Sequence, residues 1–186
     1  KYNKMSELKD YIEQRESEIE TVSSIREHTT KTVRTDNQRQ DSDIDYARVL
    51  YSSSFRRLQG KMQLLVPESL QFHRNRLTHS LEVAQIAHSI ARKLSLRDLQ
   101  TVQTCSLAHD IGNPPFGHAG EIFLSNCWEG LSYEGNAQTF RVLTHLEEKH
   151  YNYNGLNLTL RTLLGTVKYP FSQEQNNKKN LYDKDY

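Results

Sequence analysis

The sequence predicts an all-α fold, and three observations support this prediction. The chain of 186 residues holds only 8 glycines and 4 prolines, about half the combined share of roughly 12 % that is usual. Apolar residues recur at helical spacing in several segments. No segment combines alternating apolar residues with hairpin turn chemistry. This composition excludes collagen-like, mucin-like and glycine-rich all-β proteins.

The first 44 residues are predicted to be a helical arm followed by a polar connector. Residues 1–20 read as a polar helix whose sparse apolar positions, Leu8, Ile12 and Ile19 among them, need a partner. Residues 21–43 are dense in Thr, Ser, Asn, Gln and charged residues, which indicates a loop or a partly disordered connector.

Residues 45–170 are predicted to hold the main helical domain, because apolar residues become frequent there. Helical spacing runs from Tyr46 to Leu58, and Gly60 is expected to stop that helix. The strongest helical pattern spans residues 78–94. Its apolar face is expected to consist of Leu77, Leu81, Ala84, Ala91 and Leu94, widened by Val83, Ile86 and Ile90.

The later helices are expected to be shorter. Ser95 is predicted to cap the next helix, which must end near Asn113 because Pro114 and Pro115 cannot continue it. Further helices are expected over 118–126, 136–148 and 156–167, with a loop or short strand over 61–71 and a polar tail over 171–186.

Composition also narrows the functional classes. The 24 basic and 23 acidic residues leave a net charge of +1, which does not predict general nucleic-acid binding, although local clusters remain open. Cys105 and Cys127 are too few for a disulfide framework, and we find neither a signal peptide nor an apolar run near the roughly 20 residues of a membrane span. We therefore expect a reduced, soluble, cytoplasmic protein without a membrane partner. The apolar share of 35 % lies below the usual 45–50 %, which indicates long exposed arms or a fragment.

His109 and Asp110 form the first candidate site, at the end of an apolar helix and before a Gly-Asn-Pro-Pro break. Neighbouring helix residues diverge by about 100°, so the two side chains can share a metal only at a helix end. An imidazole and a carboxylate suit a divalent ion such as Mn²⁺, Fe²⁺, Co²⁺, Ni²⁺ or Zn²⁺. The alternative is a capping aspartate beside a hydrogen-bonded core histidine.

His79 is a candidate third ligand, in the first turn of the strongest helix. It shares a helix face with Val83, Ile86 and Ile90, so we expect it to point inward. A buried imidazole needs a partner, and a metal is one way to supply it. The alternative is a core histidine with an ordinary hydrogen bond.

His118 and Glu121 form a candidate acid–base pair. They lie three residues apart on a nascent helix and therefore share a face. An imidazole held by a carboxylate is the arrangement of a general acid or base. The alternative is a surface ion pair at a helix start.

Several basic residues complete the pattern: Arg48, Arg56, Arg57, Arg74, Arg76 and Lys61. The planar guanidinium matches phosphate oxygens, although a solvated face with structural ion pairs is the alternative for each arginine. Together these residues predict a metal site beside an arginine cluster, which favours a phosphoester or phosphoanhydride substrate.

The sequence resembles the HD-domain deoxynucleoside triphosphate triphosphohydrolases, which include bacterial dGTP triphosphohydrolases. The run Ala108-His109-Asp110-Ile111-Gly112-Asn113-Pro114-Pro115-Phe116-Gly117-His118 carries much of this resemblance. Further matching runs are residues 51–63, 74–83, 134–141 and 155–159. They follow one another in the family's order across residues 45–170.

The resemblance implies an HD-domain helical bundle and roles for individual residues. It implies that His79, His109, Asp110 and a later aspartate hold a divalent metal ion, either Mn²⁺, Mg²⁺, Co²⁺ or Fe²⁺. It also implies that His118 is catalytic, that Glu121 orients it and that Gln63 reads the deoxyribose. Arg56, Arg57, Arg74 and Arg76 match the family's arginines, and Asn136 matches a position near the site.

One feature of the family is missing from the sequence. The fourth ligand of the family lies in a later helix, in a run like Glu-Ala-Ala-Asp-Asp, and nothing here matches it. Asp183 and Asp185 stand in a polar tail without that context. We therefore expect the bundle to be incomplete at its C-terminus and the chain to be the N-terminal part of a longer enzyme.

These inferences predict an enzyme that hydrolyses deoxynucleoside triphosphates, dGTP in particular, to a deoxynucleoside and inorganic triphosphate. Two alternatives stay open. One is another nucleotidase or phosphodiesterase of the HD superfamily, and the other is a non-catalytic module that binds nucleotide or single-stranded DNA. The resemblance also implies a homo-oligomer, with single-stranded DNA as a candidate effector.

Overall fold

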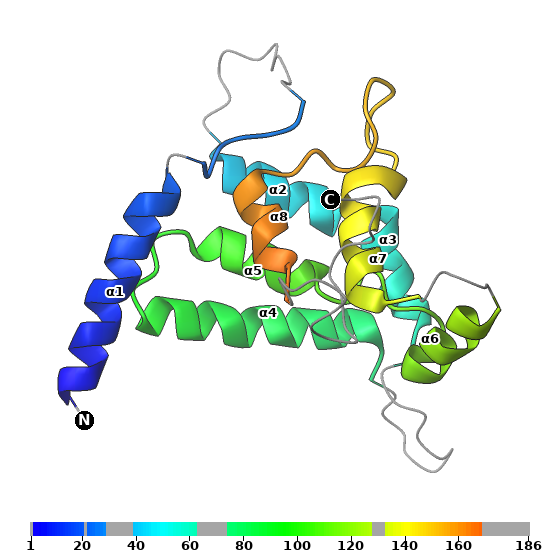
Figure 1. Ribbon diagram of the computed structural model, residues 1–186, viewed down its shortest axis with the longest axis horizontal. Helices are drawn as coiled ribbons and strands as arrows, with labels where there is room; N and C mark the ends of the chain where they lie inside the picture. The colour runs from blue at the N-terminus through cyan, green and yellow to red at the C-terminus, as the bar shows by residue number, and fades with distance from the viewer. Residues whose placement is uncertain (1, 21, 29–38, 63–73, 128–132, 169–186) are drawn as a thin grey trace.

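Helices are the only regular elements in the parts of the chain that the computed structural model describes, which are residues 2–20, 22–28, 39–62, 74–127 and 133–168 (Figure 1). Outside the helices of these ranges, β-type backbone pairing is limited to isolated bridges such as that of Met62 with Asn75. The predicted all-α class is therefore confirmed. No helix within these ranges combines the length and apolar character needed to cross a bilayer.

Two neighbouring helices lie at the centre, α4 (Arg76–Lys93) and α5 (Leu99–Ala108) (Figure 1). Two more pack against α5, namely α2 (Asp41–Leu50) and α8 (Leu160–Thr166). The remaining elements are α1 (Tyr2–Glu20), α3 (Ser53–Arg57) with a 3₁₀ turn (Leu58–Gly60), α6 (Gly117–Asn126), and α7 (Gly135–Arg141) with a π-helical turn (Val142–Leu146).

The apolar core gathers around the C-terminal end of α5. Leu107, Ala108 and Ile111 are at most 1 % exposed, and they cluster with buried residues that include Val49 and Leu158. Close packing of this kind resists displacement of any one member. The core therefore fixes the point at which α5 ends and the residues after it begin.

Side-chain caps set where four of the helices begin. Asn75 accepts a hydrogen bond from the Thr78 amide at the start of α4, and Asp98 accepts one from the Thr101 amide at the start of α5. Glu134 and Thr159 cap α7 and α8 in the same way. The expectation that Ser95 caps α5 is wrong, because Ser95 lies in the left-handed region with a φ of 61°.

Three predicted helices are interrupted or shortened. The segment from Tyr46 to Leu58 is split, because the Ser52 hydroxyl caps a new helix, α3. The helix expected over 136–148 changes to a π-helical turn at Val142. The helix expected over 156–167 starts only at Leu160, since Asn157 has a φ of 47° and Thr159 is extended.

The face of α4 also differs from the prediction. Ala84 and Ala91 are buried as expected, but Leu81, Ile86 and Ile90 are 45 %, 60 % and 55 % exposed. The buried side of α4 is therefore narrower than the apolar pattern predicts.

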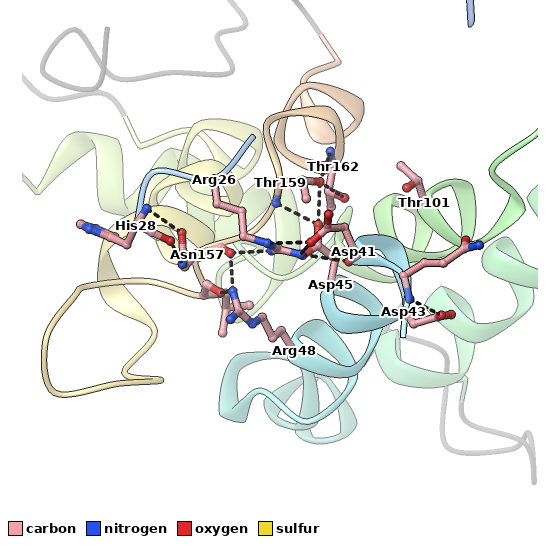
Figure 2. Close-up of polar contacts among 12 residues, drawn as sticks. Arg26, His28, Asp41, Asp43, Asp45, Arg48, Thr101, Asn157, Thr159 and Thr162 are labelled. Carbon is pink, nitrogen blue, oxygen red and sulfur yellow. Dashed lines mark hydrogen bonds and ion pairs between the residues drawn. The ribbon is translucent and has the colours of Figure 1, made fainter. Parts of the chain in front are cut away.

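A buried polar network fastens the segment after α1 to the rest of the fold (Figure 2). The Arg26 guanidinium donates to the carboxylates of Asp41 and Asp45 in α2 and to the Asn157 carbonyl oxygen. Asp45 is fully buried and also accepts hydrogen bonds from the amide and hydroxyl of Thr159. Residues 22–28 form a loop of turns and bends, as predicted for this part of 21–43, and the network holds this loop against the fold. The expected boundary between residues 44 and 45 falls inside α2.

Candidate functional site

His79, His109 and Asp110 converge although the chain separates His79 from the other two by 30 positions. Each offers one ligand atom, and these atoms all lie within 4.8 Å of one another. The two imidazole rings stand edge to face with centroids 5.3 Å apart. His79 comes from the first turn of α4, and His109 ends α5. The antiparallel packing of α4 on α5 therefore creates the cluster.

Hydrogen bonding prepares His109 to act as a ligand. Its Nδ1 atom lies 2.7 Å from the Ser106 carbonyl oxygen, to which a protonated Nδ1 donates. That bond leaves the lone pair on Nε2, which lies 3.4 Å from Asp110 Oδ1. In metal-binding histidines, a hydrogen bond from the ring nitrogen that does not bind the metal commonly sets the tautomer.

His79 is held in its neutral form. Burial is the main cause that lowers the pKa of His79, and His109, Arg74 and Arg76 lower it further against the opposing effect of Asp110. Its Nδ1 atom is buried and has no hydrogen-bond partner within the described residues. Neutral imidazole is the form that binds metals, and His79, His109 and Asp110 each offer an atom within 4.8 Å of the other two, so this set of residues fits a divalent cation.

Asp110 is fixed from two sides. The Arg76 guanidinium contacts Asp110 Oδ2 at 2.8 Å, and the side-chain amide of Asn113 donates to Asp110 Oδ1 at 2.6 Å. The Asp110 side chain is only 9 % exposed. Arg76 therefore neutralises the Asp110 carboxylate and holds it in place.

His118 and Glu121 form the expected pair. His118 Nδ1 lies 3.1 Å from Glu121 Oε2, and the His118 side chain is 85 % exposed. The other oxygen of Glu121 accepts a hydrogen bond of 2.9 Å from the Gly135 amide at the start of α7. Glu121 is thus fixed while the imidazole faces solvent.

The bend before α6 brings the residue that precedes His118 close to Arg76, the partner of Asp110. Phe116 and Gly117 both have positive φ values, 65° and 56°. A Cβ atom at Gly117 would lie 3.0 Å from the Arg76 guanidinium, which also contacts Asp110. A Cβ atom at Gly120 would lie 2.0 Å from the Pro115 carbonyl oxygen, so only glycine permits this close approach.

The other predicted residues are spread more widely. Arg57 donates to the Ile111 carbonyl oxygen at 3.3 Å, and Asn136 donates to the Glu134 carboxylate. Arg74 pairs with Glu82 on the outer side of α4, and Arg56 is exposed at the end of α3. Gln63 lies outside the described residues, as do Asp183 and Asp185.

Arg48 does not join the basic cluster around Asp110. It donates to the carbonyl oxygens of Leu156 and Asn157 in the network of Figure 2. The expectation that places it near phosphate is therefore wrong.

Sequence reasoning missed two contributors to the site, Lys61 as a structural donor and Asn113 as a partner of Asp110. The Lys61 ammonium donates to the Asn113 carbonyl oxygen. Burial, with Arg57 and Arg76 nearby, lowers the pKa of Lys61 to about 8. The signal for Asn113 was its position three residues after Asp110, a spacing that lets an amide fold back onto a preceding carboxylate.

Comparison with known proteins adds a family assignment to this geometry. The family description "HD domain" matches residues 76–165, a range that contains His79, His109 and Asp110. A deoxyguanosinetriphosphate triphosphohydrolase-like protein 2 from Vibrio cholerae is 64 % identical over 149 residues, which are 80 % of this chain and 37 % of the relative.

More distant relatives carry a similar name. A deoxyguanosinetriphosphate triphosphohydrolase-like protein from Rhodopseudomonas palustris is 51 % identical over 72 % of this chain and 33 % of its own length. One from Shewanella loihica is 44 % identical over 77 % of this chain and 34 % of its own length. The chain thus spans about a third of the length of these curated relatives.

Proposed function

The chain belongs to the HD-domain family of deoxyguanosinetriphosphate triphosphohydrolase-like proteins, and we propose from this premise that it supplies the metal-binding part of an active site that hydrolyses deoxynucleoside triphosphates. The observation that carries the proposal is the convergence of His79, His109 and Asp110, and the pairing of His118 with Glu121 supports it. The names of the relatives favour dGTP as the substrate.

His79, His109 and Asp110 would hold a divalent cation, with Mn²⁺, Mg²⁺, Co²⁺ and Fe²⁺ as the candidates. When bound, such an ion polarises a phosphate oxygen and lowers the pKa of an adjacent water. A fourth protein ligand, an aspartate, is expected outside the described residues. Arg76 and Asn113 hold Asp110 in position for this role.

In the proposed reaction, water attacks the α-phosphorus and the bond from that phosphorus to the 5′ oxygen breaks. The products are a deoxynucleoside and intact triphosphate. His118, as an imidazolium, would donate a proton to the leaving 5′ oxygen, while Glu121 orients its ring. The exposure of His118 supports this role, because its ring is open to a substrate while its Nδ1 faces Glu121.

The arginines are proposed to balance the charge of the phosphates. Arg56 is exposed, and Arg57 lies beside the residues that follow Asp110. Arg74 lies close enough to lower the pKa of His79. Guanidinium groups in such positions neutralise charge that builds on phosphate oxygens in the transition state. Gln63 and Asn136 are proposed to contact the deoxynucleoside, as the family resemblance implies.

The wider organisation is also part of the proposal. We propose an N-terminal arm that ends before α2 (Asp41–Leu50), a part of the HD phosphohydrolase domain that extends from there to residue 170, and residues 171–186 as a segment that leads to the rest of a longer enzyme. The resemblance favours a cytoplasmic homo-oligomer, with single-stranded DNA as a candidate effector.

Product analysis tests the reaction. The purified full-length protein is incubated with dGTP and Mn²⁺, with the Vibrio cholerae relative as a reference, and the products are separated by ion-exchange chromatography. Deoxyguanosine and triphosphate are expected, whereas pyrophosphate or orthophosphate would contradict attack at the α-phosphorus. Activity on nucleoside monophosphates alone would favour a nucleotidase of the same superfamily, and metal-independent binding without turnover would favour a binding module.

A further inference from the structure

The three residues after Asp110 are held by side chains from outside the loop. The Ile111 carbonyl oxygen accepts from Arg57, and the Gly112 carbonyl oxygen accepts from the Tyr133 hydroxyl at 2.6 Å. The Gly112 amide donates to the Thr139 hydroxyl at 3.0 Å. The Asn113 carbonyl oxygen accepts from the Lys61 ammonium. Four side chains from separate segments therefore fix the backbone of residues 111–113.

Gly112 shows how little space this loop has. A Cβ atom there would lie 2.2 Å from the Thr139 backbone nitrogen and 2.4 Å from the Gly135 carbonyl oxygen. The loop is thus pressed against the start of α7, the helix whose first amide also holds Glu121. A displacement of the loop would disturb both the metal ligands and the acid–base pair.

Among these four side chains, that of Lys61 is connected to Asp110 through one intermediate residue, Asn113. It donates to the carbonyl oxygen of Asn113, and the Asn113 side chain donates to Asp110 Oδ1 at 2.6 Å. The backbone of Lys61 is fixed as well, because its carbonyl oxygen accepts from the Arg76 amide at 2.9 Å. Arg76 in turn contacts the second oxygen of Asp110. Lys61 therefore links both groups that orient this carboxylate.

We infer that Lys61 is a positioning residue for the proposed metal site: its ammonium holds Asn113 so that Asn113 and Arg76 present Asp110 to the cation. This inference rests on the proposed function. It assigns to Lys61 a role different from phosphate binding, because the ammonium is already engaged with a carbonyl oxygen in the half-buried loop. Mutation of a residue that supports a metal ligand typically lowers the metal affinity by about 10–100-fold.

Mn²⁺ binding without substrate tests the inference, with the free ion followed by electron paramagnetic resonance. Lys61→Met keeps the length of the side chain but cannot donate, and we expect it to weaken Mn²⁺ binding by about 10-fold. Lys61→Arg retains a donor and should restore most of the affinity. Lys93→Met, an exposed lysine in the last turn of α4, is the matched control and should bind like the wild type. Equal affinity in Lys61→Met and the wild type would overturn the inference.

A double-mutant cycle tests the route through Asn113. If Lys61 acts by holding Asn113, the loss in Lys61→Met combined with Asn113→Ala should be smaller than the sum of the two single losses. Additive losses would overturn this route. Tyr133→Phe is a second variant that leaves Lys61 in place and removes a donor to the same loop. It should also weaken Mn²⁺ binding, and an unchanged affinity would show that the position of the loop does not control the site.

Two outcomes separate this inference from the proposed function. If the wild type does not bind Mn²⁺, the proposed metal site fails and the role of Lys61 fails with it. If the wild type binds and Lys61→Met retains full Mn²⁺ affinity but raises KM for dGTP, the proposed function stands. In that case Lys61 is a phosphate ligand and the positioning role is wrong.

Discussion

His118 can be separated from the metal ligands at the scale of single residues, because its contact is with Glu121 and its ring faces solvent. We expect His118→Ala to lower kcat for dGTP by about 10²–10⁴-fold, the usual contribution of a general acid. Mn²⁺ affinity should remain unchanged. His150→Ala, an exposed histidine in another loop, is the control. An unchanged kcat in His118→Ala would remove this residue from the mechanism.

Asp110 gives a second test, since it contacts Arg76, Asn113 and His109 and belongs to the same ligand cluster as His79. Asp110→Asn keeps the shape of the side chain but removes its charge, so Mn²⁺ affinity should fall by at least about 10-fold. If Asp110 serves only as a partner for Arg76, the same change should lower thermal stability and leave Mn²⁺ affinity as it was. Calorimetric titration with Mn²⁺ alone distinguishes the two.

Residue types and spacing were sufficient to select His79, His109, Asp110, His118 and Glu121. The structure brings the first three within 4.8 Å of one another and pairs His118 with Glu121. The argument for His79 nevertheless used the wrong face, because Ile86 and Ile90 are exposed. His79 is directed by the packing of α4 on α5, a tertiary contact that helical periodicity does not encode. Asn113 and Lys61 were missed as supporting residues for the same reason, since their role depends on main-chain atoms that become neighbours only after folding.

At the scale of elements, the five-residue helix α3 depends on Glu147, which is 6 % exposed and accepts hydrogen bonds from the amides and hydroxyls of Ser53 and Ser54. Burial alone would raise the pKa of Glu147, but these hydrogen bonds outweigh it and lower the pKa. The ionised Glu147 carboxylate therefore stabilises the fold at pH values above 4.5, the ordinary pKa of a glutamate. This stabilisation is lost as the pH falls through the lower pKa of the folded state.

Glu147→Gln tests this anchor. At pH 7 we expect the free energy of unfolding to fall by about 2 kcal/mol, because hydrogen bonds to a charged acceptor are replaced by weaker ones. The difference between variant and wild type should shrink as the pH drops well below 4.5. Urea titrations at several pH values measure it, and a difference independent of pH would contradict a role for the ionised carboxylate.

The network around Arg26 makes a further element-scale prediction. Arg26→Met leaves the buried carboxylate of Asp45 without its guanidinium partner. Breaking one side of a buried ion pair typically costs about 3–5 kcal/mol. Hydrogen exchange should also quicken in residues 22–28, which this network joins to α2 and α8 (Figure 2). Unchanged exchange there would show that other contacts hold the segment.

Element types were more predictable than their limits. Apolar periodicity located most of the helices, but α5 ends at Ala108, before the predicted end near Asn113, so Pro114 and Pro115 do not set its limit. The break at Ser52 and the π-helical turn at Val142 were not predicted, because both lie inside continuous apolar patterns. At Ser52 the side-chain hydroxyl accepts a hydrogen bond from the Phe55 amide and starts a new helix instead of continuing the preceding one. The spacing of apolar residues does not indicate this local interaction.

At the scale of the whole molecule, the balance between buried and exposed apolar surface is the feature to test. Ile86 and Ile90 lie on one side of α4 and are 60 % and 55 % exposed, and elsewhere Leu81 is 45 % and Phe123 in α6 is 68 % exposed. Apolar surface gains stability only when it is removed from water, at roughly 25 cal/mol per Å². The chain also spans only about a third of the length of its curated relatives. We therefore expect the 186-residue chain alone to be weakly stable, with a broad, low-temperature unfolding transition and strong binding of an apolar dye.

Calorimetry and dye fluorescence check this expectation, with the longer Vibrio cholerae relative as the reference. Replacing Ile86 and Ile90 by Lys should lower dye binding by the isolated chain with little loss of stability, because these side chains are already in water. The equivalent change in the longer relative should destabilise it, provided that other parts of that protein cover this side of α4. A sharp, high-temperature transition of the isolated chain would instead show that these residues need no cover, and the expectation that the chain is part of a longer enzyme would lose its physical support.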